Sequence, residues 1–344
     1  MKREIITDYP GAELEKQWLE FLTVSNYPSH YTSPGFFKEP HWTNKSAFAV
    51  LILDDGKIVA AATGLRMGKQ IVSGFAVRPQ VCIDERADRR EICENLAEAF
   101  LELAEAGDGA VERLVLNCPE QMPEFAEFGL KEKRATGGDE VVMLDLSRGT
   151  DAVFKKFSQS RRSDLRKSMR ENLVQVSPIE TEAELAELYK IHVDWSREKQ
   201  LPADSWEAMQ SIFANRDYHR IFVAKHDGKV IAGSYFRFFP RGLVEYSANN
   251  SMPEFQHLRP NDLLVWKSIE WACGENFTRY SMGGSHLFLR RFGGETVAGY
   301  RYSLDRTFLK KHDRREAVRD FAVKTYQSLP EAARQKIKRI AGRK

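Results

Sequence analysis

The same supersecondary unit occurs twice in this chain, and that repeat restricts the fold more than any other feature of the sequence. An apolar run, an Asp-Gly-Lys turn and a second apolar run span residues 47–65, and the same order returns over residues 218–239. An Asp-Gly pair between two apolar runs is typical of a tight β-hairpin. Two similar hairpins in a chain of 344 residues predict an internal duplication. This length suits two domains of about 150 residues each.

Strands and helices follow both hairpins, which predicts an α/β fold with mixed, mainly antiparallel sheets flanked by helices. In the first half, a strand at 69–77 and an amphipathic helix at 86–106 follow the hairpin, and an alternating strand at 140–146 closes the unit. We therefore expect an N-terminal domain, a C-terminal domain and a basic helical tail, at residues 1–150, 151–309 and 310–344.

Residues 244–302 concentrate the polar groups that a site would need. A strand at 244–248 precedes a polar turn, Asn261 and Asp262 are the expected N-cap of a helix over 263–273, and a strand over 277–282 leads into Gly-Gly-Ser-His. Open α/β sheets bind ligands at such strand ends, and a helix N-terminus there favours anions. A loop of aromatic residues and prolines at 26–37 could form a pocket wall, although packing against the body of the protein is the commoner role.

Composition excludes several classes of protein. No segment approaches the roughly 20 apolar residues that cross a bilayer, and the first ten residues lack the apolar core of a signal peptide, so we expect a cytoplasmic protein. The four cysteines are scattered without a Cys-x-x-Cys pair, and no histidine pair has the spacing of metal ligands. We expect reduced thiols and no metal.

The net charge of +3 is distributed unevenly. Residues 310–344 hold twelve Lys or Arg and four Asp or Glu, and a second basic group occupies residues 161–170. On a helix, Arg162, Arg166 and Arg170 would form one stripe that could hold a nucleotide-sugar diphosphate, a tRNA end or anionic lipid. The tail could lie on an anionic membrane surface. A solvated helix face is the alternative for each.

Several motifs together resemble a known family. The order of hairpin, strand, helix and strand is that of the GNAT acyltransferase fold, and two such units joined by a basic segment resemble the FemAB-type aminoacyltransferases and the BioF2-like acetyltransferase domain. The matching pieces are the Arg-Arg-Ser-Asp-Leu-Arg-Lys run at 161–167, the Trp-x-x-Ile-x-Trp helix at 266–271, Gly283-Gly284, and the Phe-Leu-Arg-Arg-Phe-Gly run at 288–293. The resemblance implies two tandem GNAT-like units that transfer an acyl group.

The chain departs from the family pattern at three places. Leu289 occupies the position of the family lysine in Phe-Lys-x-x-Phe-Gly, and Ser281 stands where an acidic residue is frequent. The glycine-rich loop that binds acetyl-CoA in simpler GNAT enzymes would fall on residues 256–262, which contain no glycine. Since the family lysine is implied in use of aminoacyl-tRNA, we expect acyl-CoA as the first donor and aminoacyl-tRNA as the second, with no tightly bound cofactor.

Acyl transfer to an amine needs a base, oxyanion donors and a proton for the leaving group. Glu245 is the candidate base, although an exposed strand carboxylate would look the same in sequence. Tyr246, Asp262 and His286 are further catalytic candidates, with core packing, helix capping and a plain surface loop as their alternatives. Candidate substrate-binding residues are Asn249, Asn250, Asn261, Arg290 and Arg291, and candidate phosphate-binding residues are Arg161, Arg162, Arg166 and Lys167.

We therefore expect an N-acyltransferase that moves an acyl group to an amine of a cell-envelope or exopolysaccharide precursor. A FemAB-like, aminoacyl-tRNA-dependent enzyme that builds peptidoglycan peptide bridges is the alternative within the same class. An inactive module that binds such precursors is the alternative from a different class, and Leu289 with the glycine-free loop favours it. Nucleic-acid binding through the basic segments would show a steep salt dependence, but their basic residues show no pattern of aromatic residues for base stacking.

Overall fold

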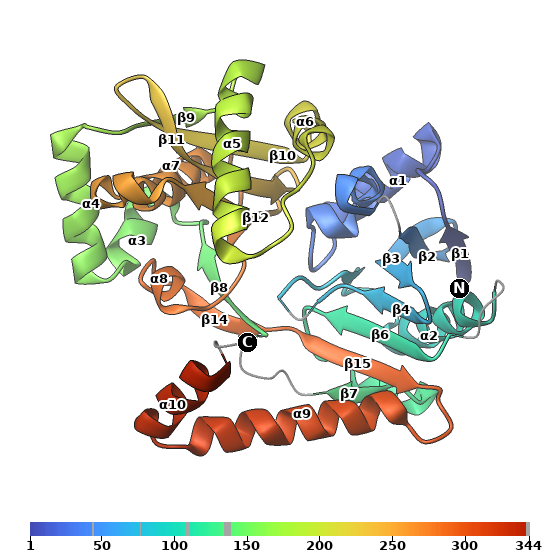
Figure 1. Cartoon of the computed structure of the whole chain (residues 1–344). Coiled ribbons are helices and arrows are strands. Elements are labelled where there is room, and N and C mark those ends of the chain that lie inside the picture. Colours follow the sequence, from blue (N-terminus) through green and yellow to red (C-terminus); the bar gives the residue numbers. More distant parts are fainter. Residues whose placement is uncertain (43–44, 76, 107–110, 134–138, 342–344) are drawn as a thin grey trace.

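Two sheets, placed side by side, organise the computed structural model of this protein (Figure 1). The structure describes residues 1–42, 45–75, 77–106, 111–133 and 139–341. The first sheet has the order β1-β2-β3-β4-β6-β15-β7, with β5 also pairing with β3. Its strands are β1 (Lys2–Ile6), β2 (Ser46–Asp54), β3 (Lys57–Met67), β4 (Gln70–Ser73), β5 (Val81–Ile83), β6 (Arg113–Cys118), β7 (Lys131–Lys133) and β15 (Tyr300–Asp305).

The second sheet has the order β14-β8-β13-β12-β11-β10-β9. Its strands are β8 (Glu140–Asp145), β9 (Gln175–Pro178), β10 (His219–His226), β11 (Lys229–Phe238), β12 (Leu243–Ser251), β13 (Arg279–Ser281) and β14 (Glu295–Ala298). Each sheet contains one antiparallel Asp-Gly hairpin, β2–β3 or β10–β11, and one parallel pair, β4–β6 or β12–β13. The predicted α/β duplication is therefore confirmed.

Helices cover both faces of each sheet because the hairpin strands are apolar on both sides. On the first sheet, α2 (Arg89–Glu105) packs on one face and α1 (Ala12–Leu22) on the other. On the second sheet, α5 (Glu182–Lys199) and α6 (Trp206–Ala214) cover one face, and α3 (Gly149–Lys156), α4 (Gln159–Glu171) and α7 (Pro260–Gly274) cover the other. A Cβ at Gly233 of β11 would lie 2.5 Å from the Leu188 side chain, so only glycine lets α5 approach so closely.

Short turns complete the chain. The aromatic loop folds as three 3₁₀ turns, η1 (His30–Thr32), η2 (Pro34–Lys38) and η3 (Pro40–Trp42), and the others are η4 (Pro123–Phe128), η5 (Pro253–Leu258) and the one-turn helix α8 (Leu287–Arg290). Helix α7 begins at Pro260 after Arg259, so the expected cap at Asn261 or Asp262 is wrong; these residues lie inside its first turn.

The two halves exchange one strand each, which the sequence did not predict. The strand expected to close the first unit is β8, and it pairs with β13 and β14 of the second sheet. In return, β15 from the C-terminal half lies between β6 and β7 of the first sheet. That expectation for residues 140–146 is wrong because strand pairing is decided by long-range packing, whereas alternation predicts only that a strand forms.

The basic tail forms two helices, α9 (Lys311–Ser328) and α10 (Glu331–Ala341). Figure 1 shows α9 running alongside β15 and β7. The buried carboxylate of Glu316 holds it there, 2.7 Å from Arg113 and 3.0 Å from Arg301. Within the described residues, no helix combines the length and the hydropathy that crossing a bilayer would need.

Candidate functional site

Strands β12 and β13 diverge in the middle of the second sheet. Their parallel pairing ends at Glu245 and Ser281, although β12 continues to Ser251. A bulge at Ser247 bends β12 at the same point, because Phe236 pairs with Tyr246 whereas Tyr235 pairs with Ala248. No strand of the described part of the chain pairs with this edge of β12 beyond Glu245. The divergence therefore exposes backbone groups that a bound ligand can use.

Gly283 fixes the point of divergence. It follows β13 with φ of +69°, and a Cβ there would lie 2.3 Å from the carbonyl oxygen of Tyr246. Only glycine combines that left-handed conformation with so close an approach. The predicted Gly283-Gly284 motif thus shapes the end of β13, next to β12.

A pocket of about 360 Å³ lies between the two units, and we call it the inter-unit pocket. Five aromatic side chains line it, Tyr31, Trp42 and Phe75 from the first unit and Trp195 and Tyr235 from the second. Its polar lining includes Arg78, Arg237, His192, Asp204, Ser247 and Asn250. Because Ser247 and Asn250 belong to β12, the pocket opens onto the strand at its bulge.

Glu245 lies at the junction of the pocket and the strand divergence. It pairs across the sheet with Arg237, its Oε1 lies 3.9 Å from Nε of Arg78, and both arginines line the pocket. The residue is 1% exposed, and its Oε2 has no hydrogen-bond partner among the described residues. Burial raises the pKa of Glu245 to about 7, and the two arginines act against that rise. A carboxyl group with this pKa can take up a proton near neutral pH.

A hydrogen-bond chain orients Asn250 on the pocket wall. The backbone N–H of Asp204 donates to Nε2 of His192 at 2.9 Å, so the ring hydrogen lies on Nδ1. That Nδ1 is 3.1 Å from Oδ1 of Asn250 and donates to it. Of the two asparagines predicted to bind substrate, Asn250 lines the pocket, whereas half-buried Asn249 does not.

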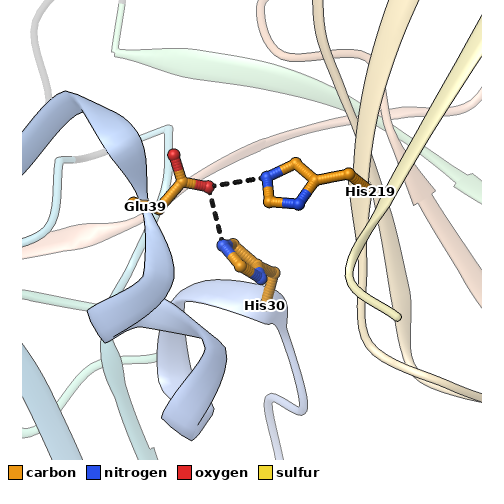
Figure 2. Close-up of side chains that lie close together, drawn as sticks. All are labelled: His30, Glu39 and His219. Carbon is orange, nitrogen blue, oxygen red and sulfur yellow. Dashed lines mark hydrogen bonds and ion pairs between the residues drawn. The ribbon is translucent and has the colours of Figure 1, made fainter. Parts of the chain in front are cut away.

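A buried group of two histidines and one carboxylate stands beside the pocket (Figure 2). Oε1 of Glu39 lies 2.7 Å from Nε2 of His30 and 3.0 Å from Nε2 of His219. These are residue types that bind metals, and their ligand atoms are close enough together to do so. However, Arg237 contacts the same carboxylate with both Nε, at 2.5 Å, and Nη2, at 2.8 Å. A guanidinium cation in that place opposes a second cation, so the residues fit an ion pair better than a metal site.

This ion pair joins the two units. Burial alone would raise the pKa of Glu39, but Arg237, His219 and His30 together hold it well below its usual range. Burial lowers the pKa of His30 to about 4, so its ring is neutral. Glu39 follows η2 of the first unit, and His219 and Arg237 are on β10 and β11 of the second. The contact therefore holds one wall of the inter-unit pocket against the other.

The motifs that carried the family resemblance meet in a different place. Arg161 of α4 pairs with buried Asp262 of α7, and its guanidinium lies 4.6 and 4.5 Å from the ring centroids of Phe288 and Phe292. Burial raises the pKa of Asp262, and Arg161 opposes the rise. The structure thus places Arg161 and Asp262 in a buried contact between helices, outside the inter-unit pocket.

The other predicted anion-binding residues lie on α4 and are largely occupied. Arg162 donates to the carbonyl oxygens of Lys155 and Phe157, and Arg166 lies 5.3 Å from the Phe154 ring centroid. Lys167 is exposed near Glu171. Together with Arg170, Arg162 and Arg166 line a shallow hollow on the surface of α4.

The remaining candidates are also outside the inter-unit pocket. Tyr246 is buried in the core on the α7 side of the sheet, and Asn261 donates to Ser251 across the start of α7. His286 is exposed at the start of α8, and Arg290 contacts Ser285 and Glu140. Arg291 is exposed. Leu289, at the position of the family lysine, is 3% exposed and packs in the core.

Sequence reasoning missed most of the pocket. Arg78, Tyr235 and Arg237 carried no motif; Arg78 lies between β4 and β5, and Tyr235 and Arg237 are both on β11 of the other unit. Besides Asn250, the aromatic loop at 26–37 was the available signal, and its Tyr31 does line the pocket. A larger hollow of about 750 Å³ lies between α5, the β10–β11 turn and the start of η5, and it shares Trp195 with the inter-unit pocket. Glu245 lines neither hollow, but its neighbours Arg78 and Arg237 line the inter-unit pocket and not the larger hollow, so the candidate base lies beside the inter-unit pocket.

The fold and the site together define the class of the protein. Residues 155–302 match the sequence model of a family described as acetyltransferase (GNAT) domain. This match confirms the predicted GNAT resemblance over these residues, and with it an acyltransferase domain. No curated protein matches it in sequence.

Solved structures are similar to the chain over nearly its whole length. The crystal structure of FemX has a TM-score of 0.71 at 13% identity, covering 89% of this chain and 98% of that one. A tandem GNAT protein from the clavulanic acid biosynthesis pathway has a TM-score of 0.53 at 14% identity, with 89% and 99% covered. L-PGS from Bacillus licheniformis has a TM-score of 0.56 at 15% identity, with 88% and 95% covered. At these identities the likeness concerns the fold, and it agrees with two GNAT-like units.

Proposed function

We propose that the protein transfers an acyl group from acyl-CoA to an amine held in the inter-unit pocket, with Glu245 as the general base. The observation that carries this proposal is the position of Glu245: a buried carboxyl with a pKa of about 7 stands where β12 and β13 diverge. The free edge of β12 can receive the amides of a thioester donor, as an added strand would. The acceptor then approaches from the opposite side, through the pocket.

The reaction needs three steps from these groups. Glu245 takes a proton from the acceptor ammonium, directly or through one water. The free amine attacks the thioester carbonyl, and unpaired backbone N–H groups of β12 beyond the bulge stabilise the oxyanion. The new C–N bond forms as the C–S bond breaks, and the CoA thiolate leaves and is protonated. Ionisation of Glu245 therefore sets the rate near neutral pH.

The proposal also names the acyl donor and the kind of molecule that carries the acceptor amine. Leu289 offers no cation at the position of the family lysine, because it is buried and apolar, and this favours acyl-CoA over aminoacyl-tRNA. The FemAB-like resemblance supports an acceptor amine on a cell-envelope or exopolysaccharide precursor. The hollow on α4 lined by Arg162, Arg166 and Arg170 is the place where a tRNA end would bind if that donor were used.

The test is CoA release with acetyl-CoA and a panel of amines, followed from pH 5.5 to 8.5. We expect kcat/KM to rise through pH 7, and Glu245→Gln to reduce it by about 10²–10⁴-fold. Glu98→Gln, at an exposed ion pair with Arg3, is the matched control and should change nothing. Full activity in Glu245→Gln would refute the role of Glu245 as general base. Transfer that is sensitive to ribonuclease and releases no CoA would show that aminoacyl-tRNA, and not acyl-CoA, is the donor.

We also propose that the tail contacts an anionic lipid surface. Val318 and Phe321 are exposed on α9 near Arg314 and Arg315, and Phe308, just before the tail, is 96% exposed. Apolar side chains among cations are typical of helices that lie in the membrane interface. The protein should sediment with vesicles containing phosphatidylglycerol and stay free with neutral ones. If Phe321→Ser sediments with anionic vesicles as fully as the unchanged protein does, this part of α9 does not contact the lipid surface.

A further inference from the structure

Two opposite charges lie close together beside the inter-unit pocket without satisfying each other. Nε of Arg78 and Oε1 of Glu245 are 3.9 Å apart, which is too long for a hydrogen bond. Arg78 Nε and Glu245 Oε2 are both buried, and neither has a hydrogen-bond partner in the described part of the chain. Since buried charged groups are costly to leave unpaired, this pair is incomplete and suits a ligand that brings both a donor and an acceptor.

The pocket adds a third unpaired group and an aromatic wall. The Tyr235 hydroxyl lines the pocket, is buried, and has no partner among the described residues. Arg78 and Arg237 lie 5.6 and 5.8 Å from the ring centroid of Tyr31. Arg237 is held by Glu39, so Arg78 is the guanidinium available to a ligand anion. The volume of about 360 Å³ is near the lower end of ligand pockets and suits a ligand the size of one residue.

We propose that the acceptor is an amino-acid unit whose amine and free carboxylate are attached to the same carbon atom. This inference rests on the proposed acyl transfer and names its acceptor. The ligand ammonium pairs with Glu245, the carboxylate pairs with Arg78, and the side chain packs against Tyr31, Trp42 and Tyr235. Positive and negative charges then alternate among Arg78, the ligand carboxylate, the ligand ammonium and Glu245. Arg78 Nε and Glu245 Oε1 are 3.9 Å apart, which matches a ligand whose two charged groups are bonded to the same carbon atom.

The reaction that follows is balanced without a further reactant. The ammonium loses one proton to Glu245, the amine nitrogen forms a bond to the acyl carbon, and the bond from that carbon to the CoA sulfur breaks. The nitrogen gives up a second proton as the amide forms, and the departing thiolate takes up a proton and ends as a thiol. The product is an N-acyl amino acid, or a precursor that carries one. The product has no ammonium for Glu245, so it binds the alternating charges more weakly than the acceptor.

Equilibrium binding without a donor tests the inference. Isothermal titration calorimetry would compare L-phenylalanine with phenethylamine, which lacks the carboxylate, and with 3-phenylpropionate, which lacks the amine. We expect phenylalanine to bind at least tenfold more tightly than either. In Arg78→Met, phenylalanine should lose this advantage over phenethylamine. Arg86→Met, at an exposed arginine paired with Asp84, is the matched control and should keep it.

Three results would overturn the inference. The first is that phenylalanine and phenethylamine bind the unchanged protein equally well. The second is that phosphoethanolamine binds as tightly as phenylalanine, and the third is that no amino acid binds at millimolar concentration. The first comparison uses the unchanged protein, so it does not depend on the folding of Arg78→Met. Failure of the proposed acyl transfer is a separate outcome, since it would appear as no CoA release with any amine while the preference for amino acids remained.

Discussion

At the scale of one residue, burial of Glu245 lowers the stability of the folded protein. Its pKa rises from an ordinary carboxyl value to about 7 in the folded protein, chiefly because it is buried. The folded state therefore holds a proton that the unfolded state has lost between pH 4.5 and 7. By linkage, this group reduces the free energy of unfolding as the pH rises through that range. The same burial that makes Glu245 a useful base thus destabilises the fold at neutral pH.

Glu245→Gln should accordingly stabilise the protein while it slows turnover. The gain should be near zero at pH 4.5 and should reach about 3 kcal/mol above pH 7, because glutamine fits the site without an ionisation penalty. Urea unfolding at several pH values measures it, with Glu98→Gln as the exposed control. A stabilisation independent of pH would show that Glu245 does not titrate in this range.

Substitution of Glu39, in contrast to substitution of Glu245, should destabilise the protein. Glu39→Gln leaves Arg237 buried without its anion, and loss of one partner from a buried pair costs about 3–5 kcal/mol. The amide nitrogen of the glutamine would also stand in place of Oε2, which accepts from Nη2 of Arg237, so a donor would face a donor. Thermal unfolding of Glu39→Gln and Glu98→Gln gives the comparison, and the exposed pair should cost under about 1 kcal/mol. Equal costs would mean that the contact in Figure 2 does not hold the units together.

At the scale of elements, the sequence predicts what is local. Both hairpins and helices α2 and α7 follow from periodicity, because alternating or helical spacing is a property of a short window. The bulge at Ser247 does not, because nothing in the sequence distinguishes it from the flanking strand. Glu245 and Asn250 could be found because Glu245 lies in, and Asn250 follows, the predicted strand at 244–248, which leads to a predicted crevice. Arg78 and Tyr235 reach the pocket only through the packing of separate units.

Arg161 and Asp262 join α4 to α7, and we expect their role to be structural. Asp262→Leu alone leaves Arg161 buried without its carboxylate and should cost about 3–5 kcal/mol. Arg161→Met combined with Asp262→Leu removes both charges and should recover most of that loss. A double-mutant cycle in urea measures the coupling. If the losses in free energy of unfolding for the two single substitutions add up to that of the double substitution, Arg161 and Asp262 do not connect α4 to α7.

At the scale of the whole molecule, the strand exchange should make the two units fold together. A cut between residues 150 and 151 leaves the first fragment without β15, which lies between β6 and β7, and the second without β8, which lies between β13 and β14. Each fragment then lacks an interior strand and exposes two unpaired sheet edges. We expect neither fragment to fold alone, whereas co-expressed fragments should associate and the intact chain should unfold in a single transition. Truncation after residue 309 keeps both sheets complete, so that control should stay folded. Cooperative unfolding of the isolated fragment 1–150 would show instead that the first unit is independent, and the inter-unit pocket would then depend on contacts such as Glu39 with Arg237 alone.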